Sequence, residues 1–569
     1  MTSASVRSEA AVVRFMGLTP PRALALPLGV SLLLVAFGLL PSARENSRLL
    51  WAFVGAGGAL LAWTAFLTAV ALRGGRTLAL EVVLRKQHYL QALAQGSVLL
   101  YWGWYWRQVY DSADLIAAQL VFAYAFDMLL GWSRRDTYTL GFGPFPVIFS
   151  INLFLWFKPD WFYLQFVLVA AGFAAKEMLR WQKDGRQTHI FNPSSFPLAL
   201  FSLVLLLTGT SDISWGTAIA TTLFNPPQIY VMIFLVGLPG QFFFGVTSMT
   251  MSAAVTTYVF GQAYFAATGT YFFFDSYIPI AVFLGMHLLF TDPSTSPRTE
   301  LGRIVFGVLY GLSVIALYAF QVDARLPTFS DKLLAVPILN LMIRGIDRTA
   351  RSKALNWLDP AALGRGFAGR QRNLAYMSIW ALIFVILSAT DGVGDTHPGH
   401  RLPFWQQACR EGRRNACGNL AVMESVYCSQ GSGWACNELG TSVADNAAGS
   451  DAARRSFQRS CDLGFLAGCD NLKISAGGTV PPSRLPPRLD DYSIVLLEGK
   501  GPLTQLTPLE LYEKACTQGW PTGCRSAGLL YLRGEWTSRD VARGGQFLRQ
   551  ACDLGLTAAC RELTAEGQP

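Results

Sequence analysis

Long apolar blocks alternate with short polar connections over the first 390 residues of the chain. A helix needs about 20 apolar residues to cross a bilayer, so each block of roughly this length predicts one membrane-spanning helix. The thirteen predicted spans lie near residues 24–41, 49–72, 89–106, 114–132, 138–157, 161–179, 194–210, 228–244, 248–271, 275–290, 304–321, 331–346 and 372–390. The block at 331–346 is short, so it is either a crossing or a buried or re-entrant segment.

The first apolar block is interpreted as a signal anchor. A second apolar block follows it, where a cleavable secretion signal would have a small-residue cleavage site. The composition supports a membrane protein, because 52% of the residues are hydrophobic and 15% are charged. Soluble domains carry about 25% charged residues.

After residue 390 the pattern changes, and cysteine becomes the informative residue. All ten cysteines lie in this part of the chain, in five pairs with seven residues between the members: Cys409/Cys417, Cys428/Cys436, Cys461/Cys469, Cys516/Cys524 and Cys552/Cys560. An even number of cysteines at one spacing predicts a disulfide framework, which persists in oxidising surroundings. Each pair closes a small loop, so the bonds are expected within the pairs.

The sequence around the cysteines repeats itself, which predicts a helical repeat. Cys516 and Cys552 are 36 residues apart, within the range of helical-hairpin repeats. A helix is expected to end near the first cysteine of each pair, and a second helix to begin near the other.

Lysine and arginine are distributed unevenly among the loops, and this predicts the orientation of the chain. Alternate loops carry few of them: Arg44, Arg48, Arg107, Lys158, Arg325 and Lys332. The other loops are basic and are expected to be cytoplasmic, with the N-terminus: Arg73, Arg76, Arg85, Lys86, Arg134, Arg135, Lys176, Arg180, Lys183, Arg186, Arg298, Arg303, Arg344, Arg348, Arg351, Lys353, Arg365, Arg370 and Arg372. Thirteen crossings then place the cysteine-rich tail in the periplasm. The net charge of +9 needs no nucleic-acid partner, since these loops account for much of it.

The sequence therefore predicts an all-α protein, in which a polytopic membrane helix bundle precedes a disulfide-stapled helical-repeat domain. The expected organisation is N-terminal anchor spans (1–79), a transmembrane domain with the last span (80–390), a linker (391–401), repeats (402–470), a Pro/Gly-rich insertion (471–506) and further repeats (507–569).

The tail carries a specific resemblance. The segments Leu511-Tyr-Glu-Lys-Ala-Cys516, Gly528-Leu-Leu-Tyr-Leu-Arg-Gly534 and Phe547-Leu-Arg-Gln-Ala-Cys552 resemble Sel1-like repeats of the cysteine-rich kind. The resemblance implies a solenoid that binds a protein partner. Some related proteins have been called β-lactamases, but the tail contains no Ser-x-x-Lys, the usual nucleophile motif of such enzymes.

Three ordered motifs in the membrane region carry a second resemblance: Lys176-Glu177 with His189-Ile-Phe-Asn-Pro-Ser-Ser-Phe196, Phe290-Thr-Asp-Pro-Ser-Thr-Ser-Pro297, and Leu339-Asn-Leu-Met-Ile-Arg-Gly-Ile-Asp347. Residues 80–350 resemble the family of the D subunit of Rnf electron-transport complexes and the B subunit of the Na⁺-translocating NADH:quinone reductase, which includes membrane proteins of enediyne clusters. Taken alone, Asn-Pro at the start of a span is also what helix capping requires.

The second resemblance implies a flavin, FMN or riboflavin, at the loop between the spans ending at 210 and starting at 228. Family members attach FMN to a threonine of Ser-Gly-Ala-Thr. This loop instead reads Ser211-Asp-Ile-Ser-Trp-Gly-Thr-Ala-Ile-Ala-Thr-Thr222, which leaves covalent attachment open. The candidate cofactor-binding residues are Thr217, Ser214, Thr221, Asn192 and Asp292. The alternative role of the threonines is helix packing.

Ionisable residues within spans are candidates for function, and Asp127, Glu177 and His287 qualify. Asp127 alternatively reaches the interface with Arg134, and His287 is alternatively a satisfied core histidine. A polar cluster after the last span is either a metal site or a linker: Asp391, Asp395, His397 and His400.

The leading hypothesis is a membrane subunit of a flavin-linked electron-transport system, embedded in lipid, with a protein partner on the periplasmic repeats and other redox subunits beside it. The chain has no Rossmann glycine motif and no iron–sulfur cysteine set, so the sequence gives it no means of oxidising NADH by itself. The alternatives are a transporter or channel of urea-channel-like architecture, and a non-catalytic anchor that displays the repeats.

Overall fold

The computed structural model describes residues 12–183, 185–224, 226–363, 369–400, 402–429, 433–446, 451–463, 466–477, 508–517, 521–554 and 556–565. The chain forms two compact units. Unit 1 contains Met1–Phe260 and Ile278–Gly394, and unit 2 contains Gly261–Tyr277 and Asp395–Pro569. Most of the Pro/Gly-rich insertion expected at 471–506 lies outside the described residues.

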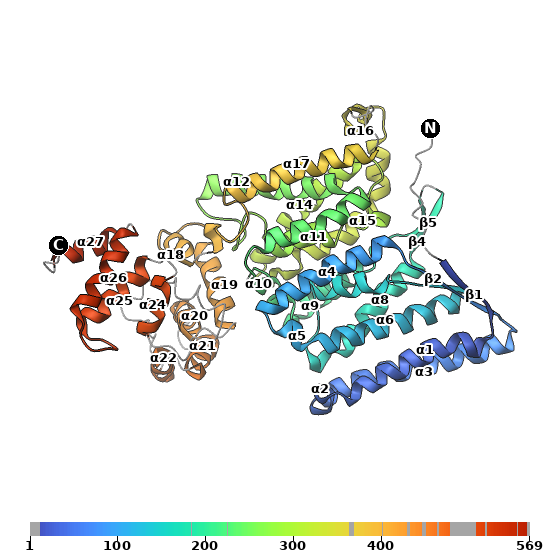
Figure 1. Ribbon diagram of the computed structural model, residues 1–569, viewed down its shortest axis with the longest axis horizontal. Helices are drawn as coiled ribbons and strands as arrows, with labels where there is room; N and C mark the ends of the chain where they lie inside the picture. Colours follow the sequence, from blue (N-terminus) through green and yellow to red (C-terminus); the bar gives the residue numbers. More distant parts are fainter. Residues whose placement is uncertain are drawn as a thin grey trace. The chain divides into compact units, whose positions relative to one another are not determined.

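Unit 1 is a helix bundle whose longest helices are apolar. Within the described part of the chain, five helices are long and apolar enough to cross a membrane: α1 (Pro20–Ala36, extended by a turn to Leu39), α3 (Ser47–Arg73), α6 (Ala113–Arg134), α14 (Glu300–Asp323) and α17 (Gly369–Ala389). Several apolar helices of sufficient length are therefore present, as expected for a membrane protein. α1 and α3 pack against each other (Figure 1).

Six further helices correspond to predicted spans and complete the bundle: α4 (Lys86–Tyr105), α8 (Tyr163–Met178), α9 (Ser195–Thr208), α11 (Ile229–Phe244), α12 (Thr247–Thr268, which continues into unit 2) and α15 (Asp331–Ala350). Unit 1 also contains the short helices α2 (Pro41–Glu45), α5 (Gln108–Asp111), α10 (Gly216–Thr222) and α16 (Pro360–Leu363). Local chemistry sets several boundaries. Asn46 accepts hydrogen bonds from the backbone N–H groups of Arg48 and Leu49 at the start of α3.

Two predicted spans are wrong as continuous crossings. The blocks at 138–157 and 275–290 contain only nine-residue helices, α7 (Pro144–Asn152) and α13 (Ile280–Leu288). At 1.5 Å per residue each is about 14 Å long, roughly half of the hydrocarbon thickness of a bilayer. The apolar residues around them are buried by protein. Leu153, Phe154 and Leu155 after α7 are all at most 1% exposed. Irregular backbone is tolerated at this depth where it is buried in protein.

The order of elements in unit 1 repeats around these half-length helices. The first series is α4, α6, α7, a short 3-10 helix that begins at Pro159, α8 and α9. The second series is α11, α12, α13, a short 3-10 helix that begins at Pro293, α14 and α15. α4 packs on α7 as α11 packs on α13, and the two series meet where α4 contacts α11 and α9 contacts α15. Each series thus places the end of a half-length helix within the bundle.

Close approach of α12 and α14 depends on glycine. A Cβ atom added at Gly307 would lie 2.2 Å from the carbonyl oxygen of Met249, and one at Gly311 would lie 3.0 Å from that of Ala253. These two glycines, four residues apart, form a small-residue stripe of the kind that lets helices in membranes approach closely.

Two small β-sheets lie beside the helices, and the all-α expectation did not include them. Strands β1 (Val12–Leu18), β2 (Leu78–Val83) and β3 (Thr137–Leu140) form one sheet, with β1 antiparallel and β3 parallel to β2. Strands β4 (Arg180–Lys183) and β5 (Arg186–His189) form a hairpin that enters α9 through Asn192.

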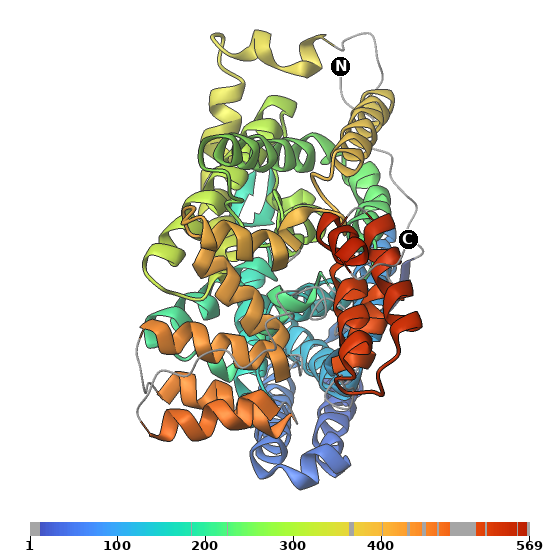
Figure 2. The ribbon, with the colours of Figure 1, turned by 90° about the vertical axis from the view of Figure 1, so that its left-hand side faces the viewer.

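In unit 2 the described helices are α18 (Leu402–Arg410), α19 (Ala416–Ser429), α20 (Gly433–Asn446), α21 (Asp451–Asp462), α22 (Leu466–Ala476), α24 (Pro508–Thr517), α25 (Pro521–Arg533), α26 (Val541–Asp553) and α27 (Thr557–Ala565) (Figure 2). Five disulfides join Cys409–Cys417, Cys428–Cys436, Cys461–Cys469, Cys516–Cys524 and Cys552–Cys560. Each bond connects the last turn of one helix to the first turn of the next, as the spacing predicts.

The segment Gly261–Tyr277 belongs to unit 2 because it holds the chain that follows the last apolar helix. Trp405 donates a hydrogen bond from Nε1 to the carbonyl oxygen of Phe274 at 3.0 Å. His397 is fully buried against the rings of Tyr271 and Tyr277.

Candidate functional site

Asn192 is the centre of a buried polar network at the start of α9. Its side-chain oxygen accepts hydrogen bonds from the backbone N–H groups of Ser194 (2.9 Å) and Ser195 (3.1 Å). Its amide nitrogen donates to the carbonyl oxygen of Leu289 (2.9 Å), just after α13. The side-chain oxygen of Asn340 accepts from the backbone N–H of Asn192 (3.2 Å). The capping role expected of Asn192 is therefore present, and the same residue also connects the two series of helices.

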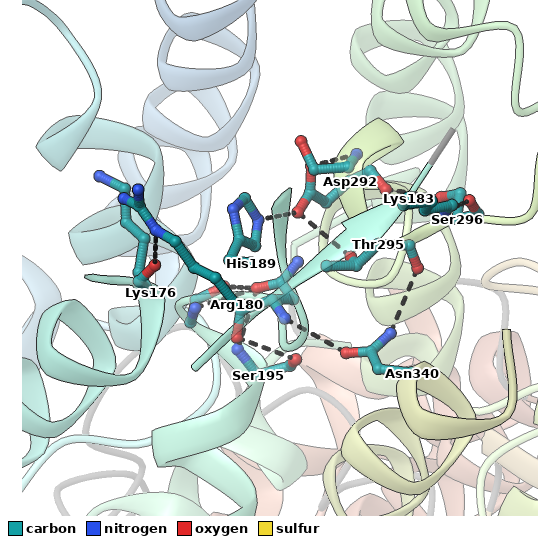
Figure 3. A network of polar contacts seen from close by, with 12 residues as sticks. Lys176, Arg180, Lys183, His189, Ser195, Asp292, Thr295, Ser296 and Asn340 are labelled. Atoms are coloured by element: carbon teal, nitrogen blue, oxygen red, sulfur yellow. Dashed lines mark hydrogen bonds and ion pairs between the residues drawn. The ribbon is translucent and has the colours of Figure 1, made fainter. Parts of the chain in front are cut away.

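The second and third sequence motifs meet at the same place (Figure 3). Asp292 lies 3.1 Å from Nε2 of His189, and it accepts hydrogen bonds from the hydroxyl of Thr295 and the N–H of Ser294. Asn340 donates to the carbonyl oxygen of Thr295. Burial raises the pKa of the Asp292 carboxyl, but the hydrogen bonds from His189, Ser294 and Thr295 outweigh it, so that the pKa is lowered overall. Asp292 is thus held as a carboxylate.

Basic side chains surround this network. Glu177 is paired with Arg180 at 2.6 Å and with Arg135 at 3.0 Å, and Arg134 lies 3.8 Å away. The buried ammonium of Lys183 donates to the carbonyl oxygen of Ser296 and fastens the β4–β5 hairpin to the loop that carries Asp292.

Asp127 has partners other than the one considered from the sequence. It accepts a hydrogen bond from the hydroxyl of Tyr138 at 2.9 Å and lies 4.0 Å from Lys176. Arg134 lies near Glu177 instead.

The candidate flavin residues do not all lie together. Asn192 and Asp292 are in the network before α9, whereas Ser214, Thr217 and Thr221 follow α9. The helix has 14 residues, so it separates the two groups by about 21 Å at 1.5 Å per residue. Within the second group, the Ser214 hydroxyl donates to the carbonyl oxygen of Ser211 and is buried. Thr221 bonds to the carbonyl oxygen of Thr217, whose own side chain is exposed.

Four indole rings gather beside this loop, which the sequence reasoning did not anticipate. The Trp106 ring lies 4.8 Å from Trp102, 5.9 Å from Trp156 and 5.9 Å from Trp215, measured between ring centroids. The Lys158 ammonium lies 5.3 Å from the Trp215 centroid. The buried Nε1 of Trp156 has no hydrogen-bond partner among the described residues. Trp102 and Trp156 are buried, whereas Trp106, Trp215 and Lys158 are half-buried, so the loop presents parts of two indole faces and a cation.

A second polar group lies inside the bundle, at the end of α13. His287, Gln95 and Gln241 are each at most 2% exposed, and each has a side-chain nitrogen or oxygen without a partner in the described part of the chain. The sequence reasoning named His287 and missed the two glutamines. Their presence within apolar helices was the available signal.

The polar cluster after the last span does not form a metal site in the structure as described. No group of three or more His, Cys, Asp or Glu side chains is arranged to hold a metal ion among the described residues. The rings of His397 and His400 are 6.2 Å apart. Nδ1 of His397 accepts a hydrogen bond from the N–H of Gly399. Burial is the main cause that lowers the pKa of His397 to about 3.

Comparison with known proteins returned no matching family model, no matching curated protein and no matching solved structure. The geometry and the sequence motifs therefore carry the functional argument.

Proposed function

We propose that unit 1 is an electron-transfer membrane subunit that binds a flavin beside the loop 211–222, and that the soluble redox chemistry is supplied by a partner. One observation carries the proposal: the cluster of Trp102, Trp106, Trp156 and Trp215 lies directly beside the loop that the Rnf-type resemblance assigns to the flavin. Bound flavin would accept and release electrons one or two at a time.

The residues present suit such a ligand. Indole faces stack on planar rings. The free Nε1–H of Trp156 suits a carbonyl oxygen, and the Lys158 ammonium suits a phosphate. Thr217 supports covalent attachment by phosphoester, since its side chain is exposed on the first turn of α10. Thr221 is the second candidate acceptor, although its hydroxyl is bonded to the Thr217 carbonyl oxygen.

The experiment is a comparison of flavin retained after acid precipitation of the purified full chain. Thr217→Ala is expected to abolish acid-stable flavin, because a phosphoester requires the hydroxyl. Thr208→Ala is the matched control, since this threonine is bonded only locally near the exposed end of α9. If acid precipitation extracts all flavin from the wild-type protein, the covalent bond is ruled out, but the proposal of electron transfer through bound flavin stands. If acid-stable flavin is retained in Thr217→Ala and lost in Thr221→Ala, the attachment site is Thr221.

A transporter or channel is the second candidate function, and a different observation favours it. Half-length helices that end within a bundle, next to unpaired polar side chains, are a common architecture for solute and ion sites in transporters. The ends of α7 and α13 fit this description, with Gln95, Gln241 and His287 beside α13. Solute flux through proteoliposomes without any flavin in the protein would favour this function. If the protein shows neither bound flavin nor solute flux, the remaining hypothesis is a non-catalytic membrane anchor.

The tail is proposed to be a Sel1-like repeat domain that docks a protein partner in the periplasm of an inner-membrane protein, with the N-terminus in the cytoplasm. Five disulfides support an oxidising compartment. The arginine- and lysine-rich loops support the orientation. Co-purification of a redox subunit that is lost on deletion of residues 402–569 would support the docking role. Unchanged co-purification would contradict it.

A further inference from the structure

His287 is buried in unit 1, and only one of its two ring nitrogens forms a hydrogen bond with the described residues. Nδ1 lies 2.8 Å from the carbonyl oxygen of Phe283, and since a carbonyl only accepts, Nδ1 carries the hydrogen. Nε2 is therefore the atom with a lone pair. It is buried, and no described residue bonds to it. An imidazole in this state can accept a proton at Nε2 without breaking the bond that fixes its ring.

The surroundings of His287 are uncharged. Its ring contacts Phe234, Phe283 and Trp380, and Gly237 of α11 faces its Cδ2 atom. No charged side chain among the described residues acts on the ring. On the helices packed around it, the charged or histidine side chains lie toward the ends: Lys86 and His88 on α4, Asp331, Lys332, Arg344, Asp347 and Arg348 on α15, and Arg370 and Arg372 on α17. α11 has none.

Polar atoms that lack partners surround the end of α13. Gln95 of α4 donates to the carbonyl oxygen of Leu288, next to His287, while its own side-chain oxygen has no partner. Gln241 follows Gly237 by one turn on the same face of α11, and both of its amide atoms are unpaired. Nε1 of Trp380 is a buried donor without a partner. Buried polar atoms without a protein partner are commonly satisfied by bound water.

A small cavity lies beside His287 and reaches Thr291, the residue before Asp292. It lies between α4 and α11, has a volume of about 10 Å³, and is lined in part by Gly237, His287 and Thr291. This is about the volume that one water molecule needs. Thr291 donates a hydrogen bond to the carbonyl oxygen of His287, and the next residue is Asp292. Asp292 in turn is bonded to His189, whose side chain is 20% exposed.

We propose that His287 is a proton-binding site in the membrane-embedded core, supplied from one membrane surface through His189, Asp292 and a water in the cavity. The proposed proton path consists of the solvent-accessible imidazole of His189, the carboxylate of Asp292, the water-sized cavity, and the buried imidazole of His287 with its free lone pair. Chains of Asp, Glu and His side chains are the usual material of proton relays in membranes. The proposal does not depend on flavin.

The test is solid-state NMR of the full chain in lipid bilayers with ¹⁵N-labelled histidine. The protein has five histidines, so His287→Gln identifies the resonance of His287 by its loss. In the wild type we expect magnetisation to pass from water to Nε2 of His287, and we expect a reversible change to imidazolium between about pH 4 and pH 8. A His287 that stays neutral and out of contact with water over this range would overturn the proposal.

Asp292→Asn tests the supply path, because it keeps a side chain of the same size and removes the carboxylate. Transfer of protons from water to Nε2 of His287 should then slow severalfold, because the path loses its carboxylate, while the equilibrium titration of His287 stays as in the wild type. Asp323→Asn is the matched control, since it makes the same change at an exposed carboxylate at the far end of α14, and it should leave proton transfer to His287 unchanged. An unchanged rate of proton transfer to His287 in Asp292→Asn would overturn the path through Asp292. The wild-type measurement remains decisive if a variant does not fold.

Discussion

Single residues in this chain combine structural and chemical roles that sequence alone cannot separate. Asn192 was equally consistent with helix capping and with a family site, and in the structure it caps α9 and also bonds to Leu289 and Asn340 from distant parts of the chain. The capping was predictable because its partners are two and three residues away. The other bonds join residues about 100 and 150 positions apart. No local pattern encodes such distances.

Glu424 of α19 provides a residue-scale prediction for unit 2. Burial, followed by the nearby carboxylate of Glu438, raises the pKa of Glu424 from 4.5 to about 8. The folded state therefore favours the protonated acid. Its contribution to stability is full below about pH 4.5 and is lost as the pH rises through about 8. Hydrogen exchange of α19 and α20, corrected for the intrinsic pH dependence, should show faster opening at pH 9 than at pH 6.

Glu424→Gln is the control for this prediction. The amide has a similar shape and does not ionise, so the variant should show little difference between the two pH values. Equal pH sensitivity in the variant and the wild type would mean that another group is responsible.

At the scale of elements, the apolar pattern predicted where the helices lie, but it did not predict that two of them are only half as long as a membrane span. Eleven of the thirteen predicted spans correspond to helices of at least 14 residues, and two are the half-length α7 and α13. Hydropathy reports that a segment avoids water, and it does so equally for a segment buried in lipid and one buried in protein. The small β-sheets were missed because their strands are four to seven residues long and pair across the ends of helices. The disulfides were predictable, since each pairing is set by a spacing of eight.

Gly307 and Gly345 provide a matched prediction about helix packing. Gly307→Ala should lower the free energy of unfolding by about 1–3 kcal/mol, because the added Cβ would meet the backbone of α12. Gly345→Ala on α15 adds a Cβ with no atom within 4 Å, so it should be neutral or stabilising by up to about 1 kcal/mol. Thermal unfolding in detergent measures both. A destabilised Gly345→Ala with an unaffected Gly307→Ala would contradict the packing of α12 on α14.

At the scale of the whole molecule, the tail cysteines and the loop charges are independent indications of the same orientation. The apolar helices indicate a membrane protein, and the disulfides and charges predict which side each end occupies. A fusion of alkaline phosphatase after Pro569 should be active, because the enzyme needs the oxidising periplasm, and a fusion at Ser352 should be inactive. Activity at Ser352 together with inactivity at Pro569 would reverse the orientation.

Electron transfer through bound flavin is the central functional claim, and the absorbance spectrum of the purified full chain tests it most directly. The account predicts flavin bands between about 350 and 500 nm that bleach on reduction, since the tryptophan cluster and the loop 211–222 are proposed to hold this cofactor. Gentle purification that yields a protein with no flavin, bound or extractable, would contradict the claim and leave transport as the better proposal.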